Sequence, residues 1–583
     1  MLFPPPSTVA SADETTAFIL LCWQELFHDD TPDTFRPRLL NLPGLVCELR
    51  DVAALATTSA AWDKHLTEVQ DELRITVANH RSLLVGSPKY AWELEHLAKR
   101  ATAKDIHIHA NLLIESENSN SFYCQPLKDA LRGMPKGKAA LETAIGNLAT
   151  FAARSDRPAG ALLNIISDDS FVKSPEEAID FLWTGSSGTP AEFAFVTSIL
   201  GDSSDINAVI RSAPGLRLYS RREKPSGVEA EEYFTRNAGS AFVYGSVQTS
   251  DSTAAAKHAL RTVGAVIDTF NLFNNRIVLS LKPMVLSWRL PDGKAQRIDV
   301  NVASLERLRP RHDARSLTQE TVQALMFSRL QGRLLNAIEL HALAHSSFAS
   351  RVRVVNLWSA IECLLPVSGV GSIVERVVNL VAPIVVARRV SKIVKYLAIS
   401  VHQYRNRYGL KLNYADGFQN SDRPRIEAAD LLHVLAQPDG HPHPKSLVTF
   451  AGQHVLLRYR LFRAWQMISD PKMLANEIEE SHQRVRWQLY RIYRARNLTV
   501  HHGEDIPLVS PMLGSLQYYF SVTLTRILRE MVKTAALDVE HAVAQIIRDD
   551  EYTRHLLTTE PSRLRTEDFL HSAQSRRGEH LWH

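Results

Sequence analysis

The sequence predicts a mainly α-helical protein with a mixed α+β segment in its middle. Apolar residues recur at helical spacing near the N-terminus and again through most of the C-terminal half, whereas the stretch between them carries short β-type runs separated by turn residues. A chain of 583 residues is also longer than one hydrophobic core usually organises. We therefore divide it into a helical N-terminal region (1–155), an α+β middle region (156–315), a helical C-terminal domain (316–550) and a polar tail (551–583).

The N-terminal region is expected to consist largely of helices. Apolar residues recur every three or four positions along residues 13–100, as in Val69 and Leu73, which is the spacing of one helix face. Residues 136–153 show the same pattern. The alternation Ile106-His107-Ile108-His109 instead predicts a short strand.

Local signals in the middle region predict alternating helices and strands. The segment Ser174-Pro175-Glu176-Glu177 combines an N-cap, a proline at the first helical position and a capping-box glutamate, and so marks a helix start. Ala241 to Tyr244 is expected to be a strand, and Asp251-Ser252 to open a helix. Pro291-Asp292-Gly293 supplies the turn of a hairpin. The strands expected around this turn are Arg276 to Leu281, Met284 to Leu290 and Arg297 to Val300.

Long helical patterns dominate the C-terminal domain. The expected helices are Val322 to Leu343, Ala349 to Leu365, Ile373 to Ala398, Leu447 to Ile468, Leu474 to Thr499 and Met512 to Ala536. We find neither an internal repeat nor coiled-coil heptads of useful length. The pattern therefore predicts a helical bundle.

The overall charge does not by itself indicate a nucleic-acid ligand. The chain has 67 Lys and Arg residues against 63 Asp and Glu residues, a formal net charge of +4, so only a local basic cluster can support such a ligand. The four cysteines are far apart and form no C-x-x-C pair. This spacing predicts neither a disulfide framework nor a zinc site, and it favours a reducing, cytoplasmic environment.

No export signal or membrane segment is expected. The N-terminus carries Pro4-Pro5-Pro6 and no basic residue ahead of its apolar stretches, unlike a signal peptide. The longest apolar run, Val377 to Ala387, is interrupted by Asn379 and Pro383. It is too short to span a bilayer.

The most distinctive feature of the sequence is the Arg-rich helix that leads to His501. Steps of three or four residues return to nearly the same helix face. One stripe therefore contains Arg486, Tyr490, Arg494, Asn497 and His501. The core-facing side is expected to contain Val485, Leu489 and Ile492. The stripe offers guanidinium groups for phosphate, flat rings for bases and a histidine that exchanges a proton near neutral pH.

Two interpretations of this stripe remain open from spacing alone. In the first, the basic and aromatic side chains bind RNA and His501 takes part in its cleavage. In the second, Arg and Tyr side chains extend from a solvated helix face and His501 caps the last carbonyl groups of the helix.

The chain resembles the HEPN superfamily, and most closely its ApeA-like branch, at two places. Arg496-Asn497-Leu498-Thr499-Val500-His501-His502-Gly503 is similar to the R-N-x-x-x-H motif of HEPN domains. Upstream, Asn356-Leu357-Trp358-Ser359-Ala360-Ile361-Glu362-Cys363-Leu364-Leu365 is similar to the first core helix of that branch, which pairs a Trp with a Glu four residues on. Ser372 to Ala387 and Met512 to Val532 would be the second helix and the closing helix. The similarity covers roughly residues 316–550.

The resemblance implies a metal-independent endoribonuclease that works as a homodimer and needs no cofactor. It implies that His501 is the general acid or base acting on the RNA 2′-hydroxyl or on the leaving oxygen. Arg496 would hold the scissile phosphate, and Asn497 would orient His501 or bind a phosphate oxygen. Glu362 would fix the arginine from the neighbouring helix. The RNA-binding residues would be Arg486, Tyr490, Arg494 and His502.

The resemblance also implies a biological role in anti-phage defence or abortive infection. Cleavage of host or viral RNA, such as tRNA, would halt growth, and the N-terminal regions would regulate the nuclease or sense a phage-derived trigger. The alternative within the same fold is a non-catalytic HEPN scaffold that binds RNA or a protein partner.

The spacing of Arg496 and His501 adds a geometric condition. Five residues along a regular helix correspond to a rotation of about 140°, so the two side chains do not converge from one continuous helix. Either one of them lies beyond the helix end, or a second copy completes the site, as in a two-fold dimer.

A metal-dependent hydrolase is a third hypothesis, from a different class. His107 and His109 alternate on the predicted strand and would both face one ion, although no acidic or cysteine partner is identifiable nearby. The chain contains no G-x-x-x-x-G-K-[ST] motif, so ATP hydrolysis is not indicated.

Overall fold

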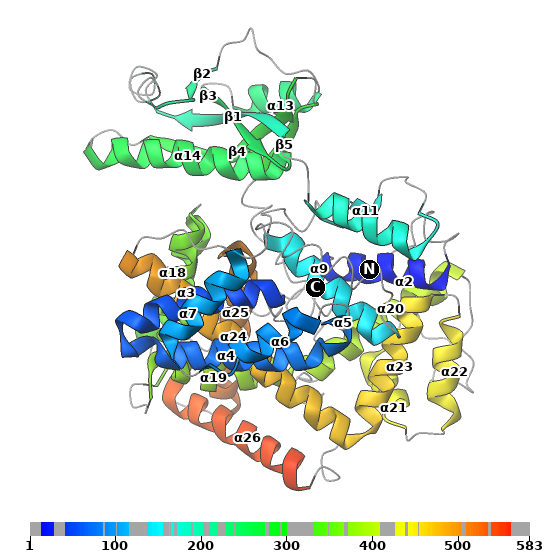
Figure 1. Cartoon of the computed structure of the whole chain (residues 1–583). Helices are drawn as coiled ribbons and strands as arrows, with labels where there is room; N and C mark the ends of the chain where they lie inside the picture. The colour runs from blue at the N-terminus through cyan, green and yellow to red at the C-terminus, as the bar shows by residue number, and fades with distance from the viewer. Residues whose placement is uncertain are drawn as a thin grey trace.

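The computed structural model describes the greater part of the chain. The described residues are 13–27, 41–84, 88–100, 102–115, 137–154, 162–163, 165–167, 172–187, 191–201, 207, 210, 213–219, 228–237, 240–273, 279–291, 294–299, 332–347, 349–366, 371–408, 426–437, 441–452, 454–502, 509–534 and 538–560. They form a mainly α-helical protein with one five-stranded antiparallel sheet (Figure 1). The predicted fold class, mainly α with a sheet in the middle of the chain, is confirmed.

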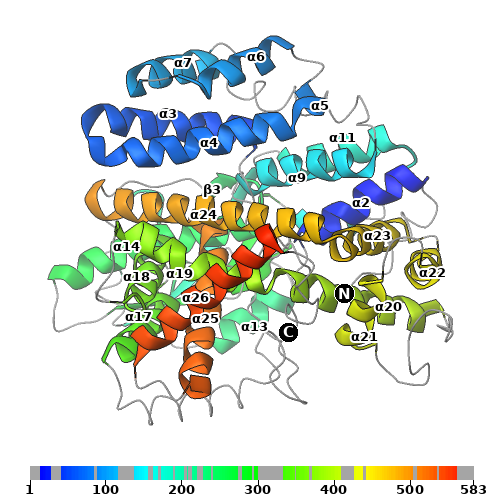
Figure 2. The same ribbon diagram turned by 90° about the horizontal axis from the view of Figure 1, so that it is seen from below.

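The helices of the N-terminal region, together with one helix of the middle region, form two groups with separate cores. The first group contains α3 (Leu42–Thr58), α4 (Asp63–Asn79), α5 (Arg81–Leu84), α6 (Pro88–Leu97) and α7 (Ala103–Glu115). The second contains α2 (Glu14–Phe27), α9 (Lys138–Arg154) and α11 (Pro175–Ser187). Figure 2 shows α3 and α4 lying along the long helix α24 (Pro471–His502), with α6 and α7 farther out.

The strand predicted at residues 106–109 is wrong, because this segment lies within α7. The buried residues Ile106, Ala110 and Leu113 recur at helical spacing, and this longer period outweighs the local alternation. Positions two apart on a helix point about 200° from each other. His107 and His109 therefore do not face a common ion.

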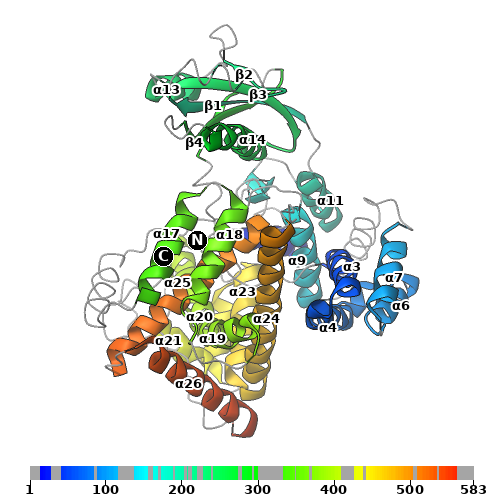
Figure 3. The same ribbon diagram turned by 90° about the vertical axis from the view of Figure 1, so that its left-hand side faces the viewer.

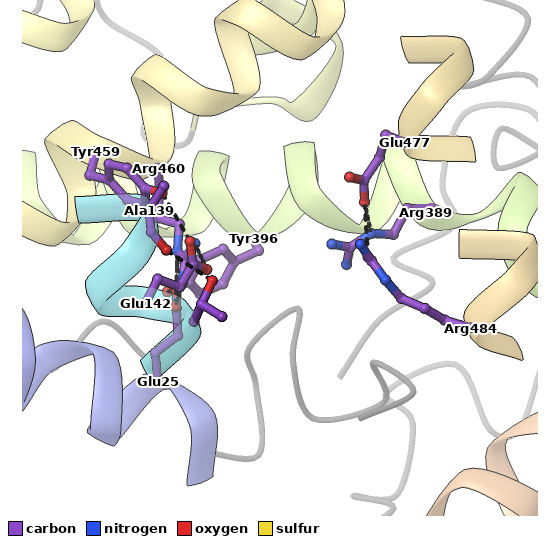
Figure 4. A network of polar contacts seen from close by, with 10 residues as sticks. Glu25, Ala139, Glu142, Arg389, Tyr396, Tyr459, Arg460, Glu477 and Arg484 are labelled. Carbon is purple, nitrogen blue, oxygen red and sulfur yellow. Dashed lines mark hydrogen bonds and ion pairs between the residues drawn. The ribbon is translucent and has the colours of Figure 1, made fainter. Parts of the chain in front are cut away.

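Ion pairs join the second N-terminal group to the C-terminal domain. On α23 (Val455–Ser469), Arg460 donates from Nε to Glu25 Oε2 of α2 at 2.9 Å and also pairs with Glu142 of α9 (Figure 4). Tyr396 of α20 (Arg389–Tyr408) donates to the same Glu25 at 2.8 Å. Since Glu25 is buried, these donors compensate a charge that would otherwise be costly.

The middle region folds into a sheet covered by a helix on each face. Its strand order is β2-β3-β1-β4-β5, with antiparallel neighbours throughout. The strands are β1 (Ala191–Leu200), β2 (Arg217–Leu218), β3 (Ala241–Thr249), β4 (Ser280–Arg289) and β5 (Gln296–Asp299). The helix α14 (Ser252–Phe273) packs on one face and α13 (Val228–Arg236) on the other. Figure 3 shows this unit set apart from the helical layers.

The sequence located most of this unit but missed its central strand. β3, the start of α14 and the β4–β5 hairpin lie where they were predicted. The two strands predicted at 276–281 and 284–290 correspond to the single strand β4, and residues 276–278 lie outside the described part. Pro283 falls where the pairing of β4 with β1 shifts register, a position that tolerates the missing N–H. β1 is buried along almost its whole length, so it lacks the alternation that reveals a half-exposed strand.

The C-terminal domain is a bundle with one shared core. Its remaining helices are α17 (Gly332–Ser346), α18 (Ser350–Glu362), α19 (Ile373–Ala387), α21 (Ala428–Leu435), α22 (Pro442–Phe450), α25 (Val509–Thr534) and α26 (Val539–Thr559). The helix predicted at 373–398 is interrupted at Arg388, and the one at 447–468 is interrupted around Gly452, whose φ of +50° favours glycine. Residues 551–559, expected in the tail, continue α26.

The helix α24 runs through the centre of this arrangement. Its 32 residues correspond to a length of roughly 48 Å. Val485, Leu489 and Ile492 are buried, as predicted for its core-facing side. Within the described residues, every helix is too short or too polar to serve as a membrane span.

Candidate active site at the end of helix α24

All but one of the predicted site residues lie on α24, in two stretches that differ in environment. Arg486, Tyr490 and Arg494 are in the middle stretch, and Arg496, Asn497, His501 and His502 are in the last two turns. The eighth residue, Glu362, is the last residue of α18. In the middle stretch, Tyr490 is 1% exposed and Arg494 is 4% exposed, so neither side chain is presented to solvent in this conformation.

The arginines of the middle stretch are paired with three glutamates from the N-terminal region. Arg486 donates from Nε to Glu68 Oε2 of α4 at 3.0 Å. Arg491 donates to Glu48 Oε2 of α3 at 2.9 Å and to Glu72 Oε2 of α4 at 2.6 Å, and Arg494 also pairs with Glu48. We call Glu48, Glu68 and Glu72 the carboxylate clamp. It occupies the guanidinium groups that were expected to bind RNA phosphates.

Burial and charge act in opposite directions on the clamp carboxylates. Burial raises the pKa of Glu48, but the charges of Arg491 and Arg494 outweigh it and lower the pKa to about 2. Burial dominates at Glu72 and raises its pKa, despite the bond to Arg491, with the negative charge of Glu48 acting in the same direction. The clamp therefore holds one firmly ionised carboxylate beside one that resists ionisation.

The aromatic rings of the middle stretch are also in contact with other parts of the chain. His65 of α4 lies 5.4 Å from the Tyr490 ring and stacks on the Tyr493 ring at 5.7 Å. The Tyr493 ring in turn lies 5.4 Å from Trp358 of α18. Rings expected to stack on bases are thus part of the packing between α4, α18 and α24.

The end of α24 carries an arginine in a different situation. Arg496 donates from Nη1 to Asn497 Oδ1 at 3.1 Å, and no carboxylate of a described residue pairs with it. Its Nε is buried and has no hydrogen-bond partner among the described residues. Arg496 therefore keeps its positive charge uncompensated by this part of the chain, with Asn497 positioning the guanidinium.

The predicted bond between Glu362 and Arg496 is not formed in this conformation. Glu362 Oε1 accepts a hydrogen bond from Trp358 Nε1 at 2.6 Å. Pro366, just beyond α18, accepts a hydrogen bond from Arg376 of α19. The neighbouring Glu375 pairs with Lys64 of α4, the residue before His65, whose ring lies beside Tyr490. The chain just beyond Glu362 is thus near Tyr490, while Trp358, one turn before Glu362, contacts Tyr493. These contacts indicate that α18 runs antiparallel to α24, with its Glu362 end toward the middle stretch rather than toward the motif.

The helix continues through the motif. Both Arg496 and His501 lie within α24, so the possibility that His501 lies beyond the helix end does not apply. The side chains of His501 and His502 are outside the described part. With the two backbone positions about 140° apart, a single chain does not bring Arg496 and His501 onto one substrate by helix geometry alone.

Two other locations contain polar side chains that are relevant to catalysis or ligand binding. Within the described residues no group of three or more His, Cys, Asp or Glu side chains is arranged to hold a metal ion, and His107 contacts the carbonyl of Arg50 at 3.2 Å. A cavity of about 280 Å³ lies between α20, α23 and α24. Two of the three arginines that line it, Arg389 and Arg460, are already paired with glutamates (Figure 4).

The clamp glutamates were not foreseen from the sequence, although α4 carries a signal for them. His65, Glu68, Glu72 and Thr76 are spaced by three or four residues and are all buried. They form a second inward face beside the apolar face that contains Val69 and Leu73. This acidic stripe has the same helical spacing as the basic stripe of α24 and the opposite charge.

Comparison of the chain with protein-family models, with curated proteins and with solved structures finds no match. A function for this chain is therefore inferred from its own residues and contacts.

Proposed function

We propose that this protein is a metal-independent endoribonuclease of the HEPN type, with its active site at the C-terminal end of α24. The observation that carries the proposal is the environment of Arg496. Its guanidinium is positioned by Asn497 and has no carboxylate partner among the described residues, whereas Arg486, Arg491 and Arg494 each have one. A cation without an internal partner is suited to bind the phosphate of a substrate.

The chemistry needs only the groups that the motif supplies. The RNA 2′-hydroxyl attacks the adjacent phosphorus while a general base takes its proton, and the 5′-oxygen leaves with a proton from a general acid. The products are a 2′,3′-cyclic phosphate and a 5′-hydroxyl. His501 is the residue of the motif that exchanges protons near neutral pH, and Arg496 stabilises the charge that develops on the phosphate.

The helical geometry favours a site shared between two copies. Arg496 and His501 diverge on a continuous helix, so Arg496 of one chain and His501 of a second chain would meet across a two-fold axis. In a homodimer of this kind each site contains residues from both copies.

The clamp restricts how RNA reaches the protein. Arg486, whose side chain is 37% exposed, would have to exchange its bond to Glu68 for a phosphate. Phosphate contacts to Arg494 and stacking on Tyr490, both of which are buried, require the α3–α4 layer to separate from α24. Contacts to Arg496, Asn497 and the end of the helix do not. RNA binding in the conformation described here therefore centres on the last two turns of α24.

The test is cleavage of labelled RNA, including tRNA, by the full-length protein in EDTA. His501→Ala and Arg496→Ala are each expected to lower the cleavage rate by about 10²–10⁴-fold, the effect of removing a general acid or base or a charge-stabilising donor. His109→Ala is the matched control, because His109 is exposed on α7 and should leave the rate unchanged. Wild-type cleavage by the His501→Ala protein would refute the site.

A non-catalytic HEPN scaffold is the alternative function. It is favoured by the clamp itself, which shows that the α24 stripe fits an acidic protein surface. This alternative predicts salt-sensitive binding of RNA or of an acidic partner without new cyclic-phosphate ends. Binding of intact RNA with no products in EDTA would support it over the nuclease.

The biological role that fits such a nuclease is anti-phage defence or abortive infection. In this proposal the N-terminal helices regulate the site, with a phage-derived trigger acting on them. Expression of the wild-type chain, compared with His501→Ala, in cells challenged with phage tests this role through survival and through the integrity of cellular RNA.

A further inference from the structure

A cluster of polar side chains lies where α17, α18 and α25 meet. His341 and His345 are one turn apart on α17, with ring centroids 4.5 Å apart. Gln517 of α25 places its Nε2 atom 2.6 Å from His345 Nε2. Arg353 lies in the first turn of α18 and bonds through its backbone N–H to Ala349 O at 3.1 Å, just after the short turn that follows His345 at the end of α17. Burial lowers the pKa of His345, and the charge of Arg353 adds to this effect. Three helices thus bring two histidines, one amide and one guanidinium together.

Arg353 is a buried cation without a counterion in the described part of the chain. Its side chain is 5% exposed, and its Nε has no hydrogen-bond partner among the described residues. No described carboxylate pairs with it. Burial therefore lowers its pKa without an opposing effect from a neighbouring acid. The other deeply buried arginines of the α24 interface, Arg491 and Arg494, are both bonded to Glu48.

The neighbours of Arg353 do not supply the missing negative charge. Burial lowers the pKa of His341 to about 4 and also lowers that of His345, so both rings are neutral near pH 7. Gln517 is buried and neutral. The His341 ring stacks on Phe520 at 4.8 Å. The cluster combines hydrogen-bonding groups with one full positive charge, which is the chemistry that binds an anion.

The cluster is reachable and lies at the motif end of the bundle. His345 is exposed, so a ligand reaches the cluster from the side of α17. Because α18 runs antiparallel to α24, Arg353 lies toward Asn497, whereas Glu362 lies toward Arg486. Figures 2 and 3 show α18 beside α24 near its C-terminal end, with α17 on the far side of α18.

We propose that Arg353, His345 and Gln517 form a subsite for a phosphate group. The anion would balance the charge of Arg353 and accept hydrogen bonds from it, with the buried Gln517 and the exposed His345 as further polar contacts. That the phosphate belongs to RNA rests on the proposed nuclease function. The presence of the phosphate site itself does not.

The first experiment measures thermal unfolding of the full-length protein in inorganic phosphate and in sodium chloride of equal ionic strength. Phosphate is expected to raise the Tm of the wild type more than chloride does, because a ligand that binds only the folded state stabilises it. Arg353→Met should remove this phosphate-specific rise. In chloride its Tm should be unchanged or higher, since the substitution removes an uncompensated buried charge.

Arg491→Met is the matched control. Arg491 is as buried as Arg353 but is bonded to two glutamates, so its replacement should lower the Tm in both salts and leave the phosphate-specific rise in place. The proposal is overturned if Arg353→Met keeps the phosphate-specific rise, or if it lowers the Tm as much as Arg491→Met does.

The second experiment distinguishes the source of the phosphate. Calorimetric titrations use inorganic phosphate and a 2′-O-methylated, non-cleavable RNA trinucleotide, with the wild type, Arg353→Met and His501→Ala. If RNA supplies the group, Arg353→Met should bind the trinucleotide at least about tenfold more weakly, whereas His501→Ala should still bind inorganic phosphate. Loss of phosphate binding in Arg353→Met, in a protein that cleaves no RNA, supports the subsite and refutes the nuclease. Equal affinities of wild type and Arg353→Met for both ligands refute the subsite.

Discussion

The middle and the end of helix α24 carry the same types of residue in opposite environments. In the middle, Arg491 and Arg494 are buried and bonded to Glu48 from a helix more than four hundred positions earlier in the chain. At the end, Arg496 is bonded to its neighbour Asn497 and has no carboxylate partner among the described residues. Arginines only two and five positions apart therefore have different partners: those of the middle stretch pair with the N-terminal region, and the one at the end has no carboxylate partner among the described residues.

This difference shows that a basic helix face does not identify a nucleic-acid site by itself. A guanidinium is informative about a ligand only after its internal partners are known. On α24 the carboxylate clamp accounts for the three arginines of the middle stretch. The residue that it leaves unexplained is Arg496, which belongs to the R-N-x-x-x-H motif.

The largest effect on the middle stretch is expected from breaking the clamp. Glu72→Ala removes one of the two carboxylates bonded to the buried Arg491, and breaking a buried pair from one side costs about 3–5 kcal/mol. Glu48 remains bonded to Arg491, so we expect the lower end of this range. Chemical denaturation measures the change. Glu480→Ala is the control, because the Glu480 side chain is 60% exposed where it pairs with Arg484.

A change below about 1 kcal/mol for Glu72→Ala would show that the middle stretch is no more strongly bound than an exposed ion pair. The contrast between the two parts of α24 would then be lost. The carboxylate clamp would then be an incidental contact that contributes little to stability.

A smaller effect is expected from the titration of His65, which packs between α4 and α24. Burial, aided by the charges of Arg494 and Lys64, lowers its pKa from 6.5 to about 4. Between pH 6.5 and pH 4, His65 is therefore protonated in the unfolded chain but neutral in the folded chain. Its contribution to the free energy of unfolding is complete above pH 6.5 and is lost as the pH falls toward 4. Acidification from pH 7 to pH 5 should destabilise the wild type by up to about 2 kcal/mol more than His65→Gln.

Urea unfolding of the two chains at both pH values measures this difference. The raised pKa of Glu72 acts in the opposite direction, but Glu72 is present in both chains and its contribution is common to them. Equal pH dependence of the wild type and His65→Gln would mean that His65 is not held neutral in the α4–α24 contact.

The smallest effect is expected at the edge of the same contact, where Lys64 pairs with Glu375. Hydrogen bonds from Lys64 and Ser372 lower the pKa of Glu375 to about 2. The two side chains are nevertheless 48% and 32% exposed, so solvent screens the pair. Lys64→Ala should cost no more than about 1 kcal/mol in denaturant unfolding, and a loss as large as that of Glu72→Ala would place the strongest contact at the edge instead of at the clamp.

Parts of this arrangement could be predicted from the sequence because they depend on local periodicity. Val485, Leu489 and Ile492 are buried where their spacing placed them, and the capped starts of α11 and α14 are correct. The periodicity of α24 alone could not show that the side opposite these apolar residues is also packed against other parts of the chain. That cover consists of Glu48, Glu68 and Glu72, which are close to α24 only in the folded chain.

The candidate site was predictable to a similar extent. The motif was expected near a helix end, and Arg496, Asn497 and His501 lie in the last described turns of α24, which is described as far as His502. The position of Glu362 depended on which end of α18 faces the motif. The direction of a helix within the fold cannot be predicted from the spacing of Trp358 and Glu362. In the structure this spacing allows a hydrogen bond between the two side chains.

The most direct test of an active site at the end of α24 compares two conservative substitutions on this helix. RNA is incubated in EDTA with Arg496→Lys, Arg486→Lys or the wild type, and 2′,3′-cyclic phosphate ends are quantified over time. Lysine keeps the charge but not the planar, bidentate geometry of arginine. We predict that Arg486→Lys forms these ends at nearly the wild-type rate and that Arg496→Lys is slower by about tenfold or more. A wild-type rate for Arg496→Lys, or an equal loss in both, would contradict a working site at the end of α24.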